Sequence, residues 1–274
     1  MSMAVGSSIV NLTASGLPTE TEDRAYSFCL GTQILQNPSQ TPRTGTFSFK
    51  ISPNQYDVSV AGDAVGNTAI GLAESTNIST VSTWSTATEL RDDGTGYGIY
   101  AISVAEKDGD GGKINIATAG QSVATVVKNR TASGTSSVDN TFECASHGYT
   151  AGDAVVITSG TLPSPLATST TYFVIPSGAN KIMLASTRAN ALAGVGNEID
   201  IIGSTSPVYL ESDDVFEIQR NGISGAVVLS RNGATIHTYA GTTTNTLRPF
   251  FWSRESSNSA TIPVFKAIKV SGAS

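Results

Sequence analysis

Residues 215–239 read VFEIQRNGISGAVVLSRNGATIHTY, and this stretch decides the fold. Three runs within it alternate apolar with polar residues, which is the period of a half-buried β-strand: 215–219, 226–230 and 235–239. Asn232 and Gly233 stand between the last two runs, and both residue types accept the positive φ that a two-residue hairpin turn requires. Asn221-Gly222 predicts a second tight reversal, so we expect a three-stranded antiparallel meander here.

The same alternation recurs along most of the chain. Only 14% of the 274 residues are charged and 27 are glycines, a composition that disfavours long helices. One short helical turn is expected within 187–194, where Arg and Ala cluster. Further strands are expected at 25–30, 46–51, 56–60, 98–104, 113–117, 123–127, 247–252 and 265–270. The sequence therefore predicts an all-β protein built from antiparallel sheets.

Two polar, turn-rich stretches, 128–140 and 203–207, divide the chain. The residues between them show a separate series of expected strands, at 154–157, 171–175, 181–185 and 198–202. We therefore expect residues 128–206 to form a small inserted β domain with flanking linkers. Residues 1–127 plus 207–274 would complete one discontinuous β-sandwich, because the C-terminal meander alone would expose hydrophobic edges.

The segment from His147 to Leu192 reads HGYTAGDAVVITSGTLPSPLATSTTYFVIPSGANKIMLASTRANAL. With its His-Gly-Tyr start, the following Gly152-Asp153 and the strand 172–175, it resembles a small β module that recurs in tail-fibre and other virion proteins of tailed bacteriophages. Within it we expect turns at the glycines, a turn hydrogen bond from Asp153, and an extended segment fixed by two prolines. The resemblance implies a virion protein.

Residues 211–241, with 247–250 after them, resemble the back half of concanavalin A-like lectin or glucanase sandwiches. The resemblance implies a jelly-roll or concanavalin A-like sandwich for the flanking domain. Neither a lectin calcium or sugar site nor a glucanase pair of carboxylates can be matched in this chain. Fold similarity therefore implies no sugar-binding or catalytic function here.

The chain offers few residues for catalysis. Its two histidines, His147 and His237, have no G-x-S-x-G motif or other nucleophile signature beside them, and His147 is expected to be a structural hydrogen-bond donor. Strand alternation would place Asp213 and Glu217 on one face, which a solvated strand edge also explains. Two further acids, Glu211 and Asp214, lie in the same stretch. We therefore expect no enzymatic activity and assign no catalytic residues.

No metal or cofactor is expected. Cys29 and Cys144 lack metal-ligand spacing and are interpreted as buried free thiols. Residues 108–112 resemble the first positions of a calcium-binding loop, but Ala119 stands where an EF-hand needs a bidentate acid. A glycine-rich hairpin loop is therefore the favoured interpretation there and at 92–94. Trp84 and Trp252 could stack on a sugar, but core or subunit-interface packing is the favoured interpretation, and ligand-binding residues remain unassigned.

The net charge of −6 argues against a phosphate-backbone binder, because the favourable electrostatic contribution to such binding is missing. No run approaches the roughly 18 apolar residues of a membrane helix, and the start of the sequence has no secretory signal pattern. We therefore expect neither nucleic-acid binding nor membrane insertion. The protein would be made in the cytoplasm of a bacterial host.

Three functions compete: a capsid decoration or cement protein, a receptor-binding tail fibre or spike, and a free carbohydrate-binding protein or hydrolase. The chain has no heptads and no short repeats, which favours a compact, non-enzymatic protein on the virion surface over a fibre. Its expected partners are other virion proteins, with a host-surface glycan as an open alternative. Few charges protect the strand edges, so a homo-oligomer is expected, a homotrimer first, with Trp84 or Trp252 near the interface.

Overall fold

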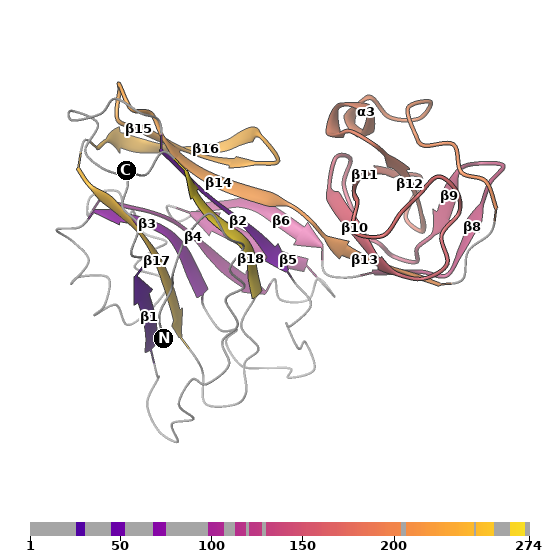
Figure 1. Cartoon of the computed structure of the whole chain (residues 1–274), viewed down its shortest axis with the longest axis horizontal. Helices are drawn as coiled ribbons and strands as arrows, with labels where there is room; N and C mark the ends of the chain where they lie inside the picture. The colour runs from indigo at the N-terminus through magenta and orange to yellow at the C-terminus, as the bar shows by residue number, and fades with distance from the viewer. Residues whose placement is uncertain are drawn as a thin grey trace, which may run out of the picture. The chain divides into compact units, whose positions relative to one another are not determined.

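The structure is a computed structural model that describes residues 26–30, 45–52, 68–74, 98–106, 113–118, 121–127, 130–203, 207–243, 245–254 and 264–271. The chain forms two compact units (Figure 1). The smaller unit contains Val126–Asp214, and the larger contains the chain on either side of it. None of the described residues form a helix with the length and apolar character that a membrane crossing requires.

The larger unit contains a six-stranded and a five-stranded sheet. The first has the order β1-β17-β3-β4-β5-β6, with bounds Tyr26–Leu30, Leu247–Arg254, Thr68–Glu74, Ile99–Glu106, Lys113–Thr118 and Gln121–Val127. The second has the order β16-β15-β14-β2-β18, with bounds Ala234–Thr242, Ala226–Arg231, Val215–Arg220, Gly45–Ser52 and Val264–Ser271. Each sheet interleaves strands from before and after the smaller unit.

Alternating apolar residues fill the space between these two sheets. On β2, Phe47, Phe49 and Ile51 are fully buried, and Phe49 stacks on Phe216 of β14 at 6.0 Å between ring centroids. Tyr239 of β16 donates a hydrogen bond across to the Ala101 carbonyl of β4 (3.1 Å). The larger unit is therefore an antiparallel β-sandwich, which confirms the predicted all-β class.

The C-terminal hairpin forms as its sequence predicts. Asn232 (φ 52°) and Gly233 (φ 78°) are the two central residues of the β15–β16 turn, and Arg231 pairs with Ala234 across it. The preceding reversal was wrongly predicted as tight, because residues 221–225 form a longer loop with the positive φ at Gly225. There the side chain of Asn221 accepts the backbone N–H groups at 223 and 224, which replaces a two-residue turn.

The smaller unit is one seven-stranded sheet in the order β7-β13-β10-β11-β12-β9-β8. Its bounds are Arg130–Ala132, Val208–Ser212, Ala154–Ser159, Thr171–Pro176, Lys181–Ala185, Thr141–Glu143 and Gly134–Ser136. The two edge strands, β7 and β8, are separated in sequence by Ser133 alone, whose N–H donates to the Glu143 carbonyl (2.9 Å). One bent segment therefore joins both edges and closes the sheet, and we call this unit the barrel module.

The barrel module has its own hydrophobic core. Fifteen buried residues form one cluster, including Phe142, Val155 and Leu210. On the opposite face of β11 and β12, the short helix α3 (Arg188–Ala193) packs Ala191 against Ile175, Met183 and Ala185. Thr187 caps this helix by accepting the N–H of Asn190, so the predicted helical turn is confirmed.

Several boundaries differ from those that the sequence predicts. Residues 208–212 form β13, which pairs with β7 and β10 and so lies in the barrel module, whereas the predicted border assigned 207 onward to the sandwich. The expected strand at 198–202 is absent; Ile202 forms an isolated bridge with Ser164. Five strands were not predicted, namely β3, β7, β8, β9 and β13. The expected strand at 56–60 lies outside the described residues.

Candidate functional site

His147, the first catalytic candidate, lies in the loop between β9 and β10 and is only 3% exposed. Its Nδ1 accepts the N–H of Tyr149 (2.9 Å), and its Nε2 lies 2.8 Å from the Gly178 carbonyl, to which it donates. The imidazole also stacks on the Tyr149 ring. Both ring nitrogens are therefore engaged with the backbone, as expected for a structural histidine.

The rest of the 147–153 loop is held by its own side chains. Gly148 (φ 65°) and Gly152 (φ 83°) adopt the positive φ expected of them as turn residues. Asp153 is 5% exposed, and its carboxylate accepts both the N–H (2.8 Å) and the hydroxyl (3.0 Å) of Thr150. This confirms the predicted turn hydrogen bond. These hydrogen bonds hold the loop in place at the start of β10.

The acidic candidates are distributed over both units. Residues 213 and 214 separate β13 from β14, but burial still alternates through them: Asp213 and Glu217 are both half-buried, while Asp214 and Phe216 are buried. Asp214, 1% exposed, accepts the N–H of Ala154 (3.3 Å) and the hydroxyl of Ser212 (3.2 Å). Asp213 accepts the Thr171 hydroxyl. Through these contacts, both aspartates connect segments of the barrel module.

Burial dominates the chemistry of two neighbouring groups in the barrel module. Cys144 is a free, fully buried cysteine, which confirms its predicted state, and burial raises the pKa of its thiol to about 11. Burial, and secondarily Cys144, raises the pKa of Tyr149 well above its ordinary value. The Tyr149 hydroxyl is buried and has no hydrogen-bond partner among the described residues. Neither group is a competent nucleophile at neutral pH.

His237, the other catalytic candidate, lies on β16 of the sandwich. Its ring meets the Tyr239 ring edge-on, with 4.9 Å between the ring centroids, and burial lowers the pKa of the imidazole. The Tyr239 hydroxyl is itself bonded to Thr118 and Ala101 on the facing sheet. The environment of His237 is thus part of the packing between the sheets.

A buried polar cluster in the sandwich was not predicted from the sequence. Glu74 of β3, 9% exposed, accepts the hydroxyl of Thr243 (2.5 Å) and the side-chain N–H of Asn245 (2.7 Å). Arg220 of β14, 1% exposed, donates to the Asn245 carbonyl (2.5 Å). Burial raises the pKa of the nearby Tyr100, with a further contribution from Glu74. We call these residues the Glu74 cluster; no local motif marks it, because its members come from distant parts of the chain.

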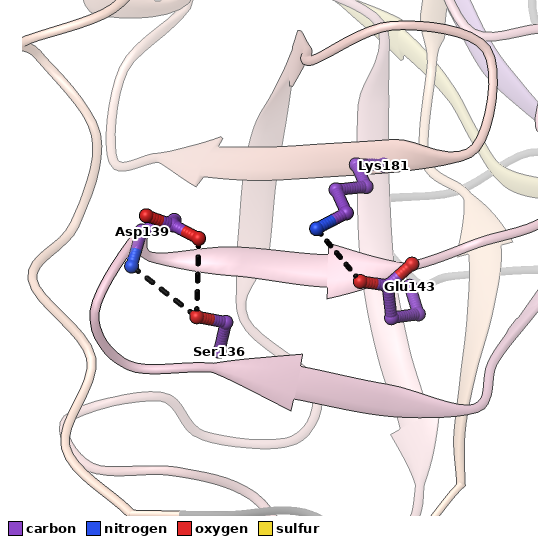
Figure 2. Close-up of polar contacts among 4 residues, drawn as sticks. All are labelled: Ser136, Asp139, Glu143 and Lys181. Atoms are coloured by element: carbon purple, nitrogen blue, oxygen red, sulfur yellow. Dashed lines mark hydrogen bonds and ion pairs between the residues drawn. The ribbon is translucent and has the colours of Figure 1, made fainter.

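An exposed polar group lies at the β8–β9–β12 edge of the barrel module, as Figure 2 shows. Lys181 Nζ contacts Glu143 Oε1 at 2.9 Å, with both side chains more than two-fifths exposed. Ser136 donates to Asp139 Oδ2 (3.3 Å) and accepts the N–H of Asp139 (3.4 Å) within the hairpin turn. Solvent screens an exposed ion pair of this kind, so Lys181 and Glu143 add little beyond the pairing of β12 with β9, while Ser136 and Asp139 hold the turn between β8 and β9.

Other candidates fall outside the described part of the chain. Trp84 and the segments 92–94 and 108–112 lie there, as do the side chains of Cys29 and Trp252. Among the residues that the structure does describe, no group of three or more His, Cys, Asp or Glu side chains could hold a metal ion.

Comparison with protein-family models finds no match, and comparison with curated proteins finds none. Among solved structures, two similar chains are both the carbohydrate recognition domain of the yeast protein Emp46p, one a point mutant and one potassium-bound. The point mutant is 8% identical, covering 84% of this chain and 71% of its own, with a TM-score of 0.27. The potassium-bound form is 8% identical, covering 83% and 70%, with a TM-score of 0.24. Such low TM-scores provide no basis for a functional assignment.

Proposed function

We propose that this protein is a non-enzymatic structural protein on the exterior of a tailed-bacteriophage virion, and specifically a capsid decoration or cement protein. The proposal rests on the resemblance of 147–192 to a module of phage virion proteins. The main observation in its favour is structural. This segment forms the hydrogen-bonded His147 loop, three strands and helix α3 of a closed barrel module that has its own core. A module of this kind, inserted into a sandwich, is suited to presentation on a particle surface.

The non-catalytic role is supported by what the candidate atoms do. His147 accepts the Tyr149 N–H of its own loop and donates to the Gly178 carbonyl of a neighbouring loop, and Asp153 and Asp214 accept backbone N–H groups. General acid or base catalysis needs such groups to face a substrate. Here these groups hold turns and strand ends in place, which is a structural role.

The proposed partners are other virion proteins and further copies of this chain. Among the described strands, β1 and β6 lie at the edges of one sandwich sheet and β16 and β18 at the edges of the other. With 14% of residues charged, the chain has little means of blocking edge-to-edge pairing by charge. A closed homotrimer, the first choice, would cover edges by symmetry.

Labelled-antibody electron microscopy on purified particles of the encoding virus tests the location. Labels over the head support a decoration protein, and labels at the tail end support the alternative of a receptor-binding fibre or spike. Particles without label contradict both. Light scattering on dilute purified protein tests the trimer, and a stable monomer mass would contradict self-trimerisation.

A further inference from the structure

The outward face of the barrel module carries a half-exposed aromatic ring on an interior strand. Tyr209 of β13 is 52% exposed, while Val208 and Leu210 on either side of it are buried in the core. Its direct cross-strand partners are Thr131 on β7 and Ser159 on β10, and both are exposed. Thr131 is directly opposed to Tyr209 in regular register and so projects from the same face, and Ser159, which follows the irregularity in β10, is likewise exposed, so each neighbouring strand offers a hydroxyl side chain beside the ring.

The backbone around this ring is fixed. At the irregularity in β10, the hydroxyl of Thr158 donates to the Tyr209 carbonyl (3.4 Å), which ties the two strands beside the ring. The following Gly160 (φ 116°) passes so close to β13 that a Cβ there would lie 2.6 Å from the Pro207 carbonyl oxygen and 2.8 Å from Val208. Tyr209 is therefore presented by a preorganised strand, and little entropy would be lost on binding.

The charge around the ring restricts the class of ligand. The chain has a net charge of −6, and Glu211, two residues further along β13, is a buried carboxylate that is 7% exposed. A phosphate or other anion would be repelled by this environment. An uncharged ligand with one apolar face and several hydroxyl groups matches a flat ring between two hydroxyl side chains.

We propose that Tyr209, Thr131 and Ser159 form a saccharide-binding platform for a neutral pyranoside. The C–H face of the sugar ring stacks on the Tyr209 ring, and the hydroxyls of Thr131 and Ser159 exchange hydrogen bonds with sugar hydroxyls at its rim. The site belongs to the barrel module alone and is independent of where the protein acts.

A titration of the isotope-labelled full chain tests this, with amide chemical shifts as the readout. The probes are methyl α-D-glucopyranoside, methyl α-D-galactopyranoside and N-acetyl-D-glucosamine. We expect one of them to bind with a Kd on the order of 1 mM, as is reasonable for a single stacking platform. The amides of residues 131, 159 and 209 should shift most.

Substitutions identify the platform as the site. Tyr209→Ala should weaken binding about tenfold by removing the stacking surface, whereas Tyr209→Phe keeps the ring and should stay within about threefold of the native affinity. The double variant Thr131→Val with Ser159→Ala should weaken binding about threefold or more. It leaves Tyr209 in place, so it tests the platform even if Tyr209→Ala proves unstable.

Ile223→Ala is the matched control, because Ile223 is an 88% exposed apolar residue on a loop of the sandwich. Its affinity for the probe should equal that of the native chain. The proposal is overturned if the native chain binds none of the three probes. It is also overturned if folded Tyr209→Ala and the double variant both bind as tightly as the native chain.

Discussion

The side chain of Thr243 donates a hydrogen bond to Glu74 Oε1 over 2.5 Å, although 169 positions separate the two residues. Thr243 follows β16 in the five-stranded sheet, and the chain then enters β17 in the six-stranded sheet, beside β3 and Glu74. The other carboxylate oxygen of Glu74 accepts from Asn245 in the same connection (2.7 Å). One buried carboxylate thus fixes the chain where it crosses between the two layers of the sandwich.

Replacing Glu74 with Ala should lower the free energy of unfolding of the sandwich by about 3 kcal/mol, because it removes two acceptors and the nearby negative charge from buried Arg220. Urea unfolding followed by tryptophan fluorescence measures this. Both tryptophans lie outside residues 126–214, so the signal does not come from the barrel module. Glu217→Ala, a half-buried acid on β14, is the control and should cost about 0.5 kcal/mol or less. Equal losses in both variants would contradict this role for Glu74.

His147→Ala should destabilise the barrel module and leave the sandwich unchanged. The substitution removes the hydrogen bond to the Gly178 carbonyl and the one from the Tyr149 N–H within the 147–149 turn, and it removes the ring that stacks on Tyr149. We expect a loss of about 2 kcal/mol in the module. Hydrogen exchange read by mass spectrometry should show faster exchange in peptides from 141–185 and unchanged exchange in peptides from 215–254.

The same variant tests the proposed absence of catalysis. We expect no polysaccharide hydrolysis by the native chain, by His147→Ala or by His237→Ala, assayed as reducing ends released over a day. Turnover by the native chain that disappears in either variant would refute the non-enzymatic proposal.

Cys144 should resist alkylation in the folded protein. Burial raises the pKa of its thiol from 9.0 to about 11, so at any pH below 9 a smaller fraction is thiolate. This corresponds to a roughly hundredfold slower reaction from ionisation alone, before access is considered. Iodoacetamide labelling at pH 8, quantified on the peptide that contains Cys144, should therefore be slow until urea unfolds the module. Rapid labelling of the native chain would show that the thiol is accessible.

The sign of this shift also predicts alkaline sensitivity. The unfolded state loses the Cys144 proton near its ordinary pKa, while the folded state retains it to about 11. Stability from this group is complete below pH 9 and declines as the pH rises towards 11. Cys144→Ala should show a smaller decline over the same range in a hydrogen-exchange or thermal unfolding series.

The sequence could predict those features whose cause is local. Asn232-Gly233 predicted its turn because positive φ is a property of the two residues themselves, and the alternation of Phe47, Phe49 and Ile51 predicted a one-sided buried strand. Strands of three residues, such as β7 and β8, are too short to show a period.

The remaining features depend on contacts between distant parts of the chain. The Glu74 cluster needs β3, β14 and the β16–β17 connection to meet, and nothing in the flanking sequence of Glu74 signals its partners. The saccharide platform is likewise set by cross-strand register, because Thr131, Ser159 and Tyr209 become neighbours only after β7, β10 and β13 have paired. Composition and spacing cannot encode register between strands so far apart.

Hydrogen bonds of two consecutive residues, Asp214 and Val215, mark the border between the two units. Asp214 accepts from Ser212 and Ala154 within the barrel module, whereas the Val215 N–H donates to the Asn232 side chain of the sandwich (2.9 Å). Replacing residues 128–214 with a Gly/Ser linker of about ten residues should therefore leave a sandwich that unfolds cooperatively in urea. Tryptophan fluorescence, which reports only on the retained segments, measures the transition.

A shorter replacement gives the control for that border. Substituting the same linker for residues 141–202 alone, the part between the two polar stretches, keeps β7, β8 and β13 but removes β9, the partner of β8, and β10, one of the two partners of β13. Ala132, Val208 and Leu210, now buried, would lose their core and become exposed. We expect this variant to aggregate or to bind a hydrophobic dye, while the 128–214 replacement stays monodisperse apart from its native oligomerisation. A 128–214 replacement without a cooperative transition would show that the sandwich depends on the barrel module for its fold.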